Sequence, residues 1–526
     1  MFLTEKKLKY INIYMNKYNS TLVDKIKYNR INFQYLRNSL INIPTYFLVY
    51  YKGISELTTL QYDVYDNIAP INPKYYSWIL LPKDNYDLIT NFRMPYLKIY
   101  RNVKPHTSFP PIEDVMTLFR NNENHRIIHP KMNALLLSFA GYFAHIFFQT
   151  WYNEKNIPYQ NYRNDLTAAP IYGTTIEMEN VVRKHKNGKI RMRKDKTPLH
   201  ISDLTVEEAK LFNMTNPNKN PELFVCGISR ANVSIGTYLF HTLFQRNHNR
   251  ICKLIKKVNS GFDDETMFQL AKTINLYHMI NIVMYEYVPF LVNIPILSDN
   301  FRDFTSPYSL SKLSRGIESG RTVPFDYNLI YQWHLALPDK IGKHSLQKIA
   351  YNTDILYKNN MAEIVDKLQD TKCYTQHIVN CQSYLEPAEQ KAIQVSRNIN
   401  MLTYCEYRKK IGYPIPKTFR DITQEDYFSE RLKQVYKKVE NVDCYVGINS
   451  EPTGFFIFPE VISYTLGGFA IGGLTNNFTN YRLFIENYDI RLLSIVNDFT
   501  FEDFFHKNFS ENEKFKSSRK VSFQYK

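Results

Sequence analysis

Long stretches of apolar and aromatic residues, with few turn dipeptides between them, run through the central and C-terminal parts of the chain. Only 17 of the 526 residues are glycine, so this pattern predicts a mainly α-helical fold. The longest helices are expected at Asn133–Trp151, at about Asn232–Val258 and at roughly Asp264–Val288. Thr205 is expected to be the N-cap of a shorter helix that ends near Leu211. Further helices are expected at residues 341–369, 387–411 and 424–440.

The same pattern divides the chain into three regions. Residues 1–125 form an N-terminal region, in which basic amphipathic material is followed from residue 53 by extended, proline-rich connecting structure. Within this region the apolar stretch Leu40–Lys52 suits either contact with a membrane surface or a helix docked on the main core. Residues 126–500 are expected to form one large domain, and residues 501–526 a polar, basic tail.

The formal net charge of +16 suits nucleic acid, an anionic membrane surface or acidic small molecules as partners. The positive residues are scattered, however. Their densest run, Arg183–Lys196, contains the pair Asn187 and Gly188, which favours a solvated hairpin. No nucleic-acid-binding motif accompanies this run, so nucleic-acid binding is not expected.

The six cysteines show neither CxxC spacing nor clustering, and we expect isolated buried thiols rather than a disulfide framework or a zinc site. The N-terminus lacks the apolar core of a signal peptide. The longest apolar runs are too short or too broken to form a transmembrane helix. These features predict a cytoplasmic protein whose contact with a membrane is at most peripheral.

Candidate chemistry is concentrated in the aromatic and apolar stretch Tyr331–Asp339. If this stretch begins a helix, Tyr331 and His334 share one face and Trp333 is turned elsewhere. A neutral histidine in an apolar pocket is the usual fifth ligand of a haem iron, and a phenol one turn away is close enough to be oxidised. On spacing alone, the simpler interpretation is a buried tyrosine and a histidine with satisfied hydrogen bonds.

Two further stretches carry a histidine and an arginine in apolar surroundings. Asn133–Thr150 contains His145, which taken alone is typical of a packed core histidine. Phe224–Gly236 contains Arg230, whose simplest role is a structural ion pair or a contact at a helix end. Each stretch is ambiguous by itself.

Taken in order, these stretches resemble the animal haem peroxidase superfamily, and within it the cyclooxygenases and related fatty-acid dioxygenases. Phe139–Thr150 is similar to the distal-histidine helix, which ends in His-x-Phe-Phe-x-Thr. Arg246–Cys252 resembles the core-helix motif Arg-Glu-His-Asn-Arg-Val-Cys. Tyr331–Asp339 resembles the proximal Tyr-His-Trp-His followed by Leu-Leu-Pro-Asp. Asp165–Gly173 and Glu406–Lys410 match further segments, and the similarity runs from about residue 130 to 475.

The resemblance implies a helical domain with haem b bound between the distal helix and the proximal segment, and it implies a role for each candidate residue. His334 would be the proximal axial ligand of the haem iron. His145 would lie on the distal side of the haem, acting as general base and then general acid towards peroxide. Arg230 matches the distal arginine of the peroxidase branch, which stabilises charge on the cleaving O–O bond. Tyr445 falls where cyclooxygenases connect a tyrosine through water to the proximal histidine.

Tyr331 separates the functions that this resemblance allows. In the fatty-acid dioxygenases this tyrosine becomes a radical that removes a hydrogen atom from a bound fatty acid, after which oxygen adds to the carbon radical. The leading hypothesis is therefore a cyclooxygenase-like dioxygenase with peroxidase activity, acting on a polyunsaturated fatty acid, O2 and peroxide. A plain haem peroxidase, favoured by Arg230, is the alternative. A non-catalytic lipid-binding relative is a third possibility, and a homodimer is the family expectation.

Several positions depart from the family pattern. Gly141 replaces the distal-pocket glutamine four residues before His145, so altered cleavage of peroxide is expected. Ala144 and Val233 replace the carboxylates that link haem covalently, which predicts non-covalent haem. Ile146 replaces a calcium-binding aspartate, and this predicts that the calcium site is absent. Lys52 is the candidate nearest in position to the arginine that binds the substrate carboxylate.

Overall fold

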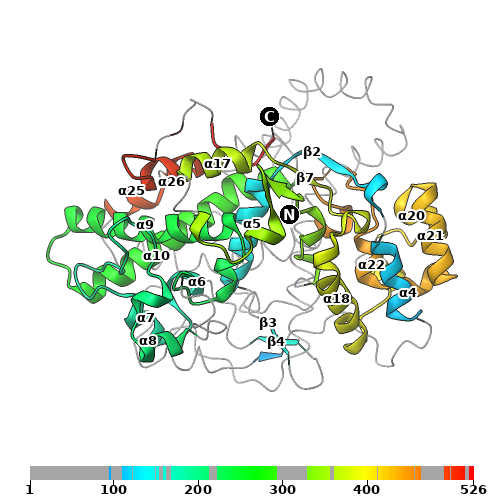
Figure 1. Cartoon of the computed structure of the whole chain (residues 1–526), viewed down its shortest axis with the longest axis horizontal. Coiled ribbons are helices and arrows are strands. Elements are labelled where there is room, and N and C mark those ends of the chain that lie inside the picture. Colours follow the sequence, from blue (N-terminus) through cyan, green and yellow to red (C-terminus); the bar gives the residue numbers. More distant parts are fainter. Residues whose placement is uncertain are drawn as a thin grey trace, which may run out of the picture. The chain divides into compact units, whose positions relative to one another are not determined.

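The computed structural model of the protein is mainly helical, which confirms the predicted fold class (Figure 1). The chain divides into two compact units, Met1–Leu57 and Thr58–Lys526, and every described residue belongs to the second. The stretch Leu40–Lys52 therefore lies outside the described residues. The structure describes residues 94–95, 109–120, 122–147, 150–152, 158–160, 168–212, 222–292, 329–355, 360–410, 413–454, 456–463, 491–497, 499–513, 515 and 520–525.

Three long helices, α5 (Ala134–Phe147), α9 (Ile235–Val258) and α10 (Asp264–Ile282), pack together in the described fold. Helix α9 packs against both of the others (Figure 1). They confirm the three long helices expected from the sequence. Gly236 lets α9 approach α5 closely, because a Cβ atom there would lie 2.0 Å from Oγ of Ser138. This contact holds α5, whose last turn carries the candidate distal histidine.

The ends of these helices differ from the expected ones. Helix α9 begins after Ser234, whose Oγ accepts a hydrogen bond from the backbone N–H of Thr237 at 3.1 Å. It starts three residues later than expected because Ser229–Asn232 form the 3-10 turn η6. Helix α10 passes into a π-helical turn, η7 (Val283–Tyr287), and then into α11 (Val288–Val292). Single π turns of this kind are frequent at functional sites.

The other long helices expected from the sequence are broken. Residues 387–411 form α18 (Glu386–Asn398) and α19 (Tyr404–Lys410), with Asn400 between them at φ +55°. Gly342, at φ +56°, turns the chain into a hairpin where residues 341–369 were expected to be helical. The elements found in these regions are β5 (Lys340–Ile341), β6 (His344–Ser345), α15 (Leu346–Ile349), α17 (Met361–Gln369), α20 (Arg420–Thr423), α21 (Asp426–Tyr436) and η12 (Val439–Asn441).

The described C-terminal residues include a buried aromatic cluster, which differs from the polar tail expected from the sequence. Helix α26 (Phe501–Asn508) lies against α9 and buries Phe501, Phe504 and Phe505 completely. Phe523 is also buried, with its ring centroid 4.3 Å from that of Phe501. These phenylalanines outweigh the basic residues around them because burying each ring removes a large apolar surface from water.

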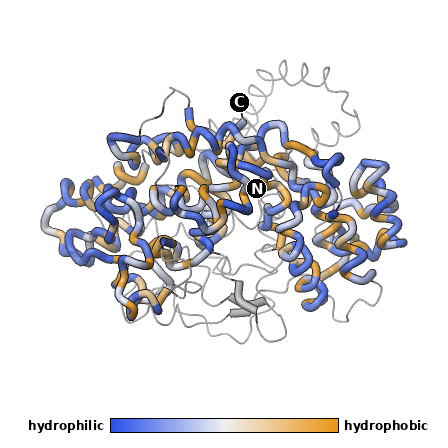
Figure 2. Tube along the Cα trace, viewed as in Figure 1, coloured by the Kyte–Doolittle hydropathy of each residue, from blue (hydrophilic) through white to orange (hydrophobic). Residues whose placement is uncertain are grey.

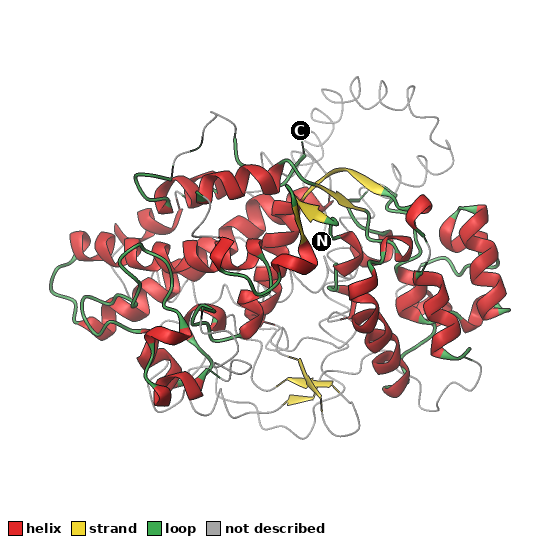
Figure 3. Ribbon diagram, in the orientation of Figure 1, coloured by secondary structure: helices red, strands yellow, loops and turns green. Residues whose placement is uncertain are grey.

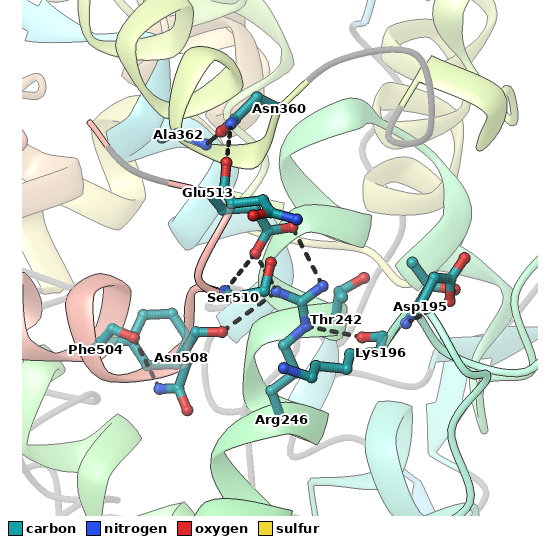
Figure 4. Close-up of polar contacts among 12 residues, drawn as sticks. Asp195, Lys196, Thr242, Arg246, Asn360, Ala362, Phe504, Asn508, Ser510 and Glu513 are labelled. Atoms are coloured by element: carbon teal, nitrogen blue, oxygen red, sulfur yellow. Dashed lines mark hydrogen bonds and ion pairs between the residues drawn. The ribbon is translucent and has the colours of Figure 1, made fainter. Parts of the chain in front are cut away.

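A polar cluster fastens this C-terminal segment to α9 (Figure 4). Arg246 donates from Nε to the carbonyl of Lys196 at 2.7 Å and from Nη1 to Oε2 of Glu513 at 2.5 Å. Its Nη1 also lies 3.3 Å from the carbonyl oxygen of Asn508. One guanidinium therefore joins α9, the loop at Lys196 and the segment after α26.

Strands are few and short in the described structure (Figure 3). The strand β2 (Ile128–Asn133) pairs with β7 (Lys372–Tyr374) and leads directly into α5. The predicted hairpin is confirmed by the antiparallel bridge between Arg183 and Ile190. Residues 184–186 are exposed as expected of a solvated hairpin, and within the turn Gly188 is buried. The remaining strands and α-helices are β1 (Met94–Pro95), β3 (Thr150–Tyr152), β4 (Pro158–Gln160), α4 (Ile112–Met116), α6 (Ala169–Tyr172), α7 (Ile176–Val182), α8 (Val206–Leu211), α22 (Cys444–Ile448) and α25 (Arg491–Asn497).

Hydrophilic and hydrophobic residues alternate along the helical segments, as expected of helices that bury one face (Figure 2). Thr205 caps α8 as predicted, with its Oγ1 accepting from the backbone of Glu208. All six cysteines are buried free thiols, which confirms their predicted state. Among the described residues, no helix combines the length and the apolar character needed to cross a membrane.

Candidate active site

The stretch Tyr331–Asp339 does not begin a helix, so that premise of the sequence prediction is wrong. Only a single 3-10 turn forms, η9 (His334–Ala336), which Trp333 precedes in a non-helical conformation. Leu337 is extended because it stands before a proline, and this ends the turn. Trp333 is not turned elsewhere, since its ring centroid lies 4.5 Å from that of Tyr331.

The imidazole of His334 is held on one side only. Its Nδ1 lies 3.0 Å from Oε1 of Glu389, a residue of α18 whose side chain is completely buried. The side chain of His334 is 38% exposed, although Leu335 and Ala336 beside it are fully buried. Within the described part of the chain, Nε2 of His334 makes no hydrogen bond. This nitrogen is therefore the one free to bind a metal ion.

Tyr445 reaches His334 through the side chain of Glu389. Its hydroxyl, carried by α22, donates to Oε2 of Glu389 at 2.5 Å. Burial and then the adjacent carboxylate hold the pKa of Tyr445 well above its usual value, so the phenol keeps its proton. The link between Tyr445 and His334, which the resemblance implied through water, is thus made here by a carboxylate.

Glu389 was not among the residues that the sequence predicted. It lies among buried positions of α18 that include Ala392, Ile393 and Ser396. Glu389 stands three and four residues before Ala392 and Ile393, so it falls on the apolar face of the helix. An acidic residue on such a face is a sequence signal of a buried acid that needs a partner.

His145 lies in the last turn of α5, and its Nδ1 is buried without a hydrogen-bond partner in the described structure. Burial, and to a smaller extent the charges of Arg230 and His334, lower the pKa of His145 to about 3. The three side chains are therefore close enough to interact electrostatically. A neutral imidazole at ordinary pH is available to accept a proton.

Arg230 lies in η6, just before α9. The amide of Asn232 fixes this turn by bonding to both backbone groups of Phe224, at 2.8 Å to the carbonyl and 3.2 Å from the N–H. The side chain of Arg230 is exposed, and no ion-pair partner for it occurs among the residues that the structure describes. A structural ion pair, the simpler role considered for this arginine, is therefore not observed there.

Tyr331 is paired with a second tyrosine. Its hydroxyl lies 2.7 Å from that of Tyr287, which the π turn η7 contributes from 44 residues away. Burial raises the pKa of Tyr331, and the bond to Tyr287 partly offsets this effect. Trp333 lies between Tyr331 and Phe458, with ring centroids 4.5 and 4.2 Å away. No local sequence signal pointed to Tyr287.

Gly141 lies one turn before His145 on α5. A Cβ atom added there would meet only Cγ2 of Thr237, at 3.9 Å, which is ordinary van der Waals contact. No close approach therefore requires glycine at this position. The side chain of Ile146 and the whole of Lys52 lie outside the described residues.

These residues fit a haem group. His334 offers Nε2 while its Nδ1 is engaged, which is the arrangement expected of an axial histidine ligand. His145 presents an unpaired ring nitrogen, and Arg230 adds a cation within electrostatic range. In the described regions, no cluster of three or more metal-ligating side chains occurs.

A model of the animal haem peroxidase family matches residues 147–461, and the chain belongs to this family. Among curated proteins, it is 25% identical over 358 residues to prostaglandin G/H synthase 2 of Gallus gallus, covering 66% of this chain and 57% of that protein. The chain thus spans little more than half the length of the curated relatives it matches.

Two solved structures show the same fold at low sequence identity. A variant of the Oryza sativa fatty acid alpha-dioxygenase with palmitic acid matches with a TM-score of 0.71 and 14% identity, covering 90% of this chain and 92% of that one. Peroxidase A from Dictyostelium discoideum matches with a TM-score of 0.63 and 15% identity, covering 82% and 94%. The predicted family and fold are confirmed.

Proposed function

We propose that this protein is a haem-dependent dioxygenase of polyunsaturated fatty acids that also reduces peroxides. The proposal rests on the pair Tyr331 and Tyr287, whose hydroxyls lie 2.7 Å apart. Tyr331 stands three residues before His334 in the chain. Removal of a hydrogen atom from a substrate by a tyrosyl radical needs an oriented phenol of this kind, and peroxide reduction alone does not require one. The relatives named above, a prostaglandin synthase and a fatty acid alpha-dioxygenase, favour a lipid substrate.

His334 would hold haem as the axial ligand, with His145 and Arg230 on the peroxide-binding side. When bound, haem supplies the redox chemistry that no protein side chain provides. Non-covalent attachment stays a prediction, as do the homodimer and peripheral contact with a membrane.

His145 and Arg230 would act on the bound peroxide. Because the pKa of His145 is lowered to about 3, its imidazole is neutral and accepts the peroxide proton, which it returns to the leaving oxygen. Arg230 keeps its charge and stabilises the negative charge that develops on the cleaving O–O bond.

Tyr331, as a phenoxyl radical, would remove a hydrogen atom from the fatty acid. A C–H bond of the substrate breaks, the O–H bond of Tyr331 forms, and O2 adds to the resulting carbon radical. The peroxyl product then takes the hydrogen atom back from Tyr331, which regenerates the radical and leaves a hydroperoxide. Tyr287 holds the oxygen of Tyr331 in place through the 2.7 Å hydrogen bond.

Oxygen uptake by haem-loaded protein tests this function. Wild-type protein should consume oxygen with a polyunsaturated fatty acid, and Tyr331→Phe should abolish uptake while peroxidase turnover persists. Tyr238→Phe is the matched control, because this buried tyrosine bonds only to backbone carbonyls, at 2.9 Å to Asn352. No oxygen uptake by the wild type with any such fatty acid would refute the proposal.

A plain haem peroxidase is the second candidate, and it is favoured by Arg230, which is exposed and has no ion-pair partner among the described residues. In that case Tyr331→Phe would change neither activity, and the wild type would oxidise ordinary peroxidase substrates without consuming oxygen.

A further inference from the structure

Glu389 is a completely buried acid without a lysine or arginine partner among the described residues. Charged side chains are rarely buried in this way unless they are paired, because leaving water is costly for an ion. Its two carboxylate oxygens contact a histidine and a tyrosine instead. Oε1 faces Nδ1 of His334 at 3.0 Å, and Oε2 accepts from the hydroxyl of Tyr445 at 2.5 Å.

This geometry determines the tautomer of His334. A carboxylate can only accept hydrogen bonds, so the proton of a neutral imidazole lies on Nδ1, facing Oε1. The lone pair is then on Nε2, the nitrogen that makes no hydrogen bond within the described structure. A histidine fixed in this way is oriented for metal binding before the metal arrives.

We propose that Glu389 is the positioning residue of the haem ligand: it fixes the tautomer of His334 and strengthens its nitrogen as an electron donor, and Tyr445 moderates this effect. The inference rests on the proposed binding of haem by His334. A carboxylate acceptor gives the imidazole partial anionic character, which stabilises the ferric state and favours cleavage of the O–O bond. The hydroxyl of Tyr445 withdraws part of the carboxylate charge through its short bond to Oε2.

A second buried glutamate shows what a purely structural pair looks like. Glu451 accepts from the hydroxyl of Tyr404 at 2.6 Å, and Arg408 neutralises it at 2.8 Å. Among the described residues, Glu451 makes no hydrogen bond or ion pair with His334, and its ion pair with Arg408 explains its burial. The pairs Glu389–Tyr445 and Glu451–Tyr404 thus share a chemistry and differ in the third partner, a histidine in one and an arginine in the other.

Two substitutions should move haem properties in opposite directions. In haem-loaded Glu389→Gln, the iron–histidine stretching frequency of the ferrous protein should fall and the ferric/ferrous midpoint potential should rise. In Tyr445→Phe the carboxylate loses a hydrogen-bond donor, so the frequency should rise and the potential should fall. Peroxidase turnover should drop roughly tenfold in Glu389→Gln. Glu389→Asp keeps the charge, so its changes in frequency and potential should be smaller than those of Glu389→Gln. Glu451→Gln should leave both haem properties unchanged.

The outcomes separate this inference from the function on which it rests. Histidine-ligated haem in the wild type, with no shift in Glu389→Gln, would overturn the inference and leave the function standing. Shifts of the same sign in Glu389→Gln and Tyr445→Phe would also overturn it, because they indicate a general loosening of the site. Absence of histidine-ligated haem in the wild type overturns both. If Glu389→Gln does not fold, the sign of the shift in Tyr445→Phe decides the question.

Discussion

His334 and His145, the two histidines of the candidate site, are held in different ways. The first has Nδ1 engaged by a buried carboxylate, which a tyrosine from a further helix holds in turn. The second has an unpaired Nδ1, and the nearby Arg230 is exposed without an ion-pair partner among the described residues. One side of the site is fixed by a hydrogen-bond chain, and the other leaves its polar groups available.

This difference follows from what each side has to do. An axial ligand must keep one orientation and one tautomer throughout a reaction, which a chain of buried hydrogen bonds provides. A group that transfers protons to and from a substrate must have an atom free to bind it. A buried polar atom without a partner costs folding free energy, and in the described structure Nδ1 of His145 is such an atom, whereas Nδ1 of His334 is bonded to Glu389. This contrast fits the proposed roles of His145 towards substrate and of His334 towards the cofactor.

Removing the imidazole of His334, the histidine held by Glu389, should have the largest effect, which is the loss of haem ligation. His334→Ala should lose the Soret absorption of histidine-ligated ferric haem, because the axial nitrogen is gone. An ultraviolet–visible spectrum of haem-reconstituted protein measures this. His506→Ala, at an exposed histidine of α26, is the control and should retain the wild-type spectrum. A wild type without a Soret band of this kind would point instead to a non-catalytic relative that keeps the fold.

Removing the charge of Arg230, on the His145 side of the site, should slow peroxide reduction and leave haem binding unchanged. Arg230→Gln should lower the rate of peroxide reduction about 100-fold, since a preorganised cation near the cleaving bond is lost. The haem spectrum and the midpoint of thermal unfolding should stay near wild type because this side chain is exposed. Arg420→Gln breaks only an exposed pair with Asp426 and is the matched control. An unchanged rate would show that Arg230 does not act on the peroxide.

Acid should destabilise the protein through His248 and His278, two buried histidines outside the candidate site. Both ring nitrogens of His248 are bonded, to Tyr172 and Gly188, and those of His278 to Asn247 and Ile495. Burial lowers their pKa values to about 4 and about 3, below the usual value of about 6.5. The unfolded state therefore binds more protons as pH falls below about 6.5, and stability present above that pH is lost.

Each of these two histidines should cost about 2 kcal/mol of unfolding free energy between pH 7.5 and 5, on the scale of about 1.4 kcal/mol per pKa unit. Urea unfolding at the two pH values measures the loss. His248→Gln should reduce the pH dependence by one such increment, although its own stability is lower. A pH dependence identical to that of the wild type would mean that His248 titrates normally in the folded protein.

The sequence indicates the long helices and the motif residues, but not the contacts made across the chain. Helices α5, α9 and α10 are predictable because each carries a long apolar run with few breakers. The local structure around His334 is not predictable in this way, because Pro338 limits it to a single 3-10 turn. Glu389 and Tyr287 stand 55 and 44 residues from the side chains they contact, and only the packing of α18 and the π turn η7 brings them there.

The smallest expected effect is a change in the free energy of unfolding at Gly141, which lies one turn before His145 on α5. Gly141→Ala should raise the free energy of unfolding by about 1 kcal/mol, because glycine within a helix is unfavourable and a Cβ here meets only Thr237 at 3.9 Å. Gly236→Ala, on the facing helix, should destabilise the protein, since its Cβ would lie 2.0 Å from Oγ of Ser138. Chemical denaturation compares the two variants with the wild type. If Gly141→Ala is stabilising and peroxide turnover is unchanged, glycine has no catalytic role at this position; if turnover falls, the space beside His145 is used by the substrate.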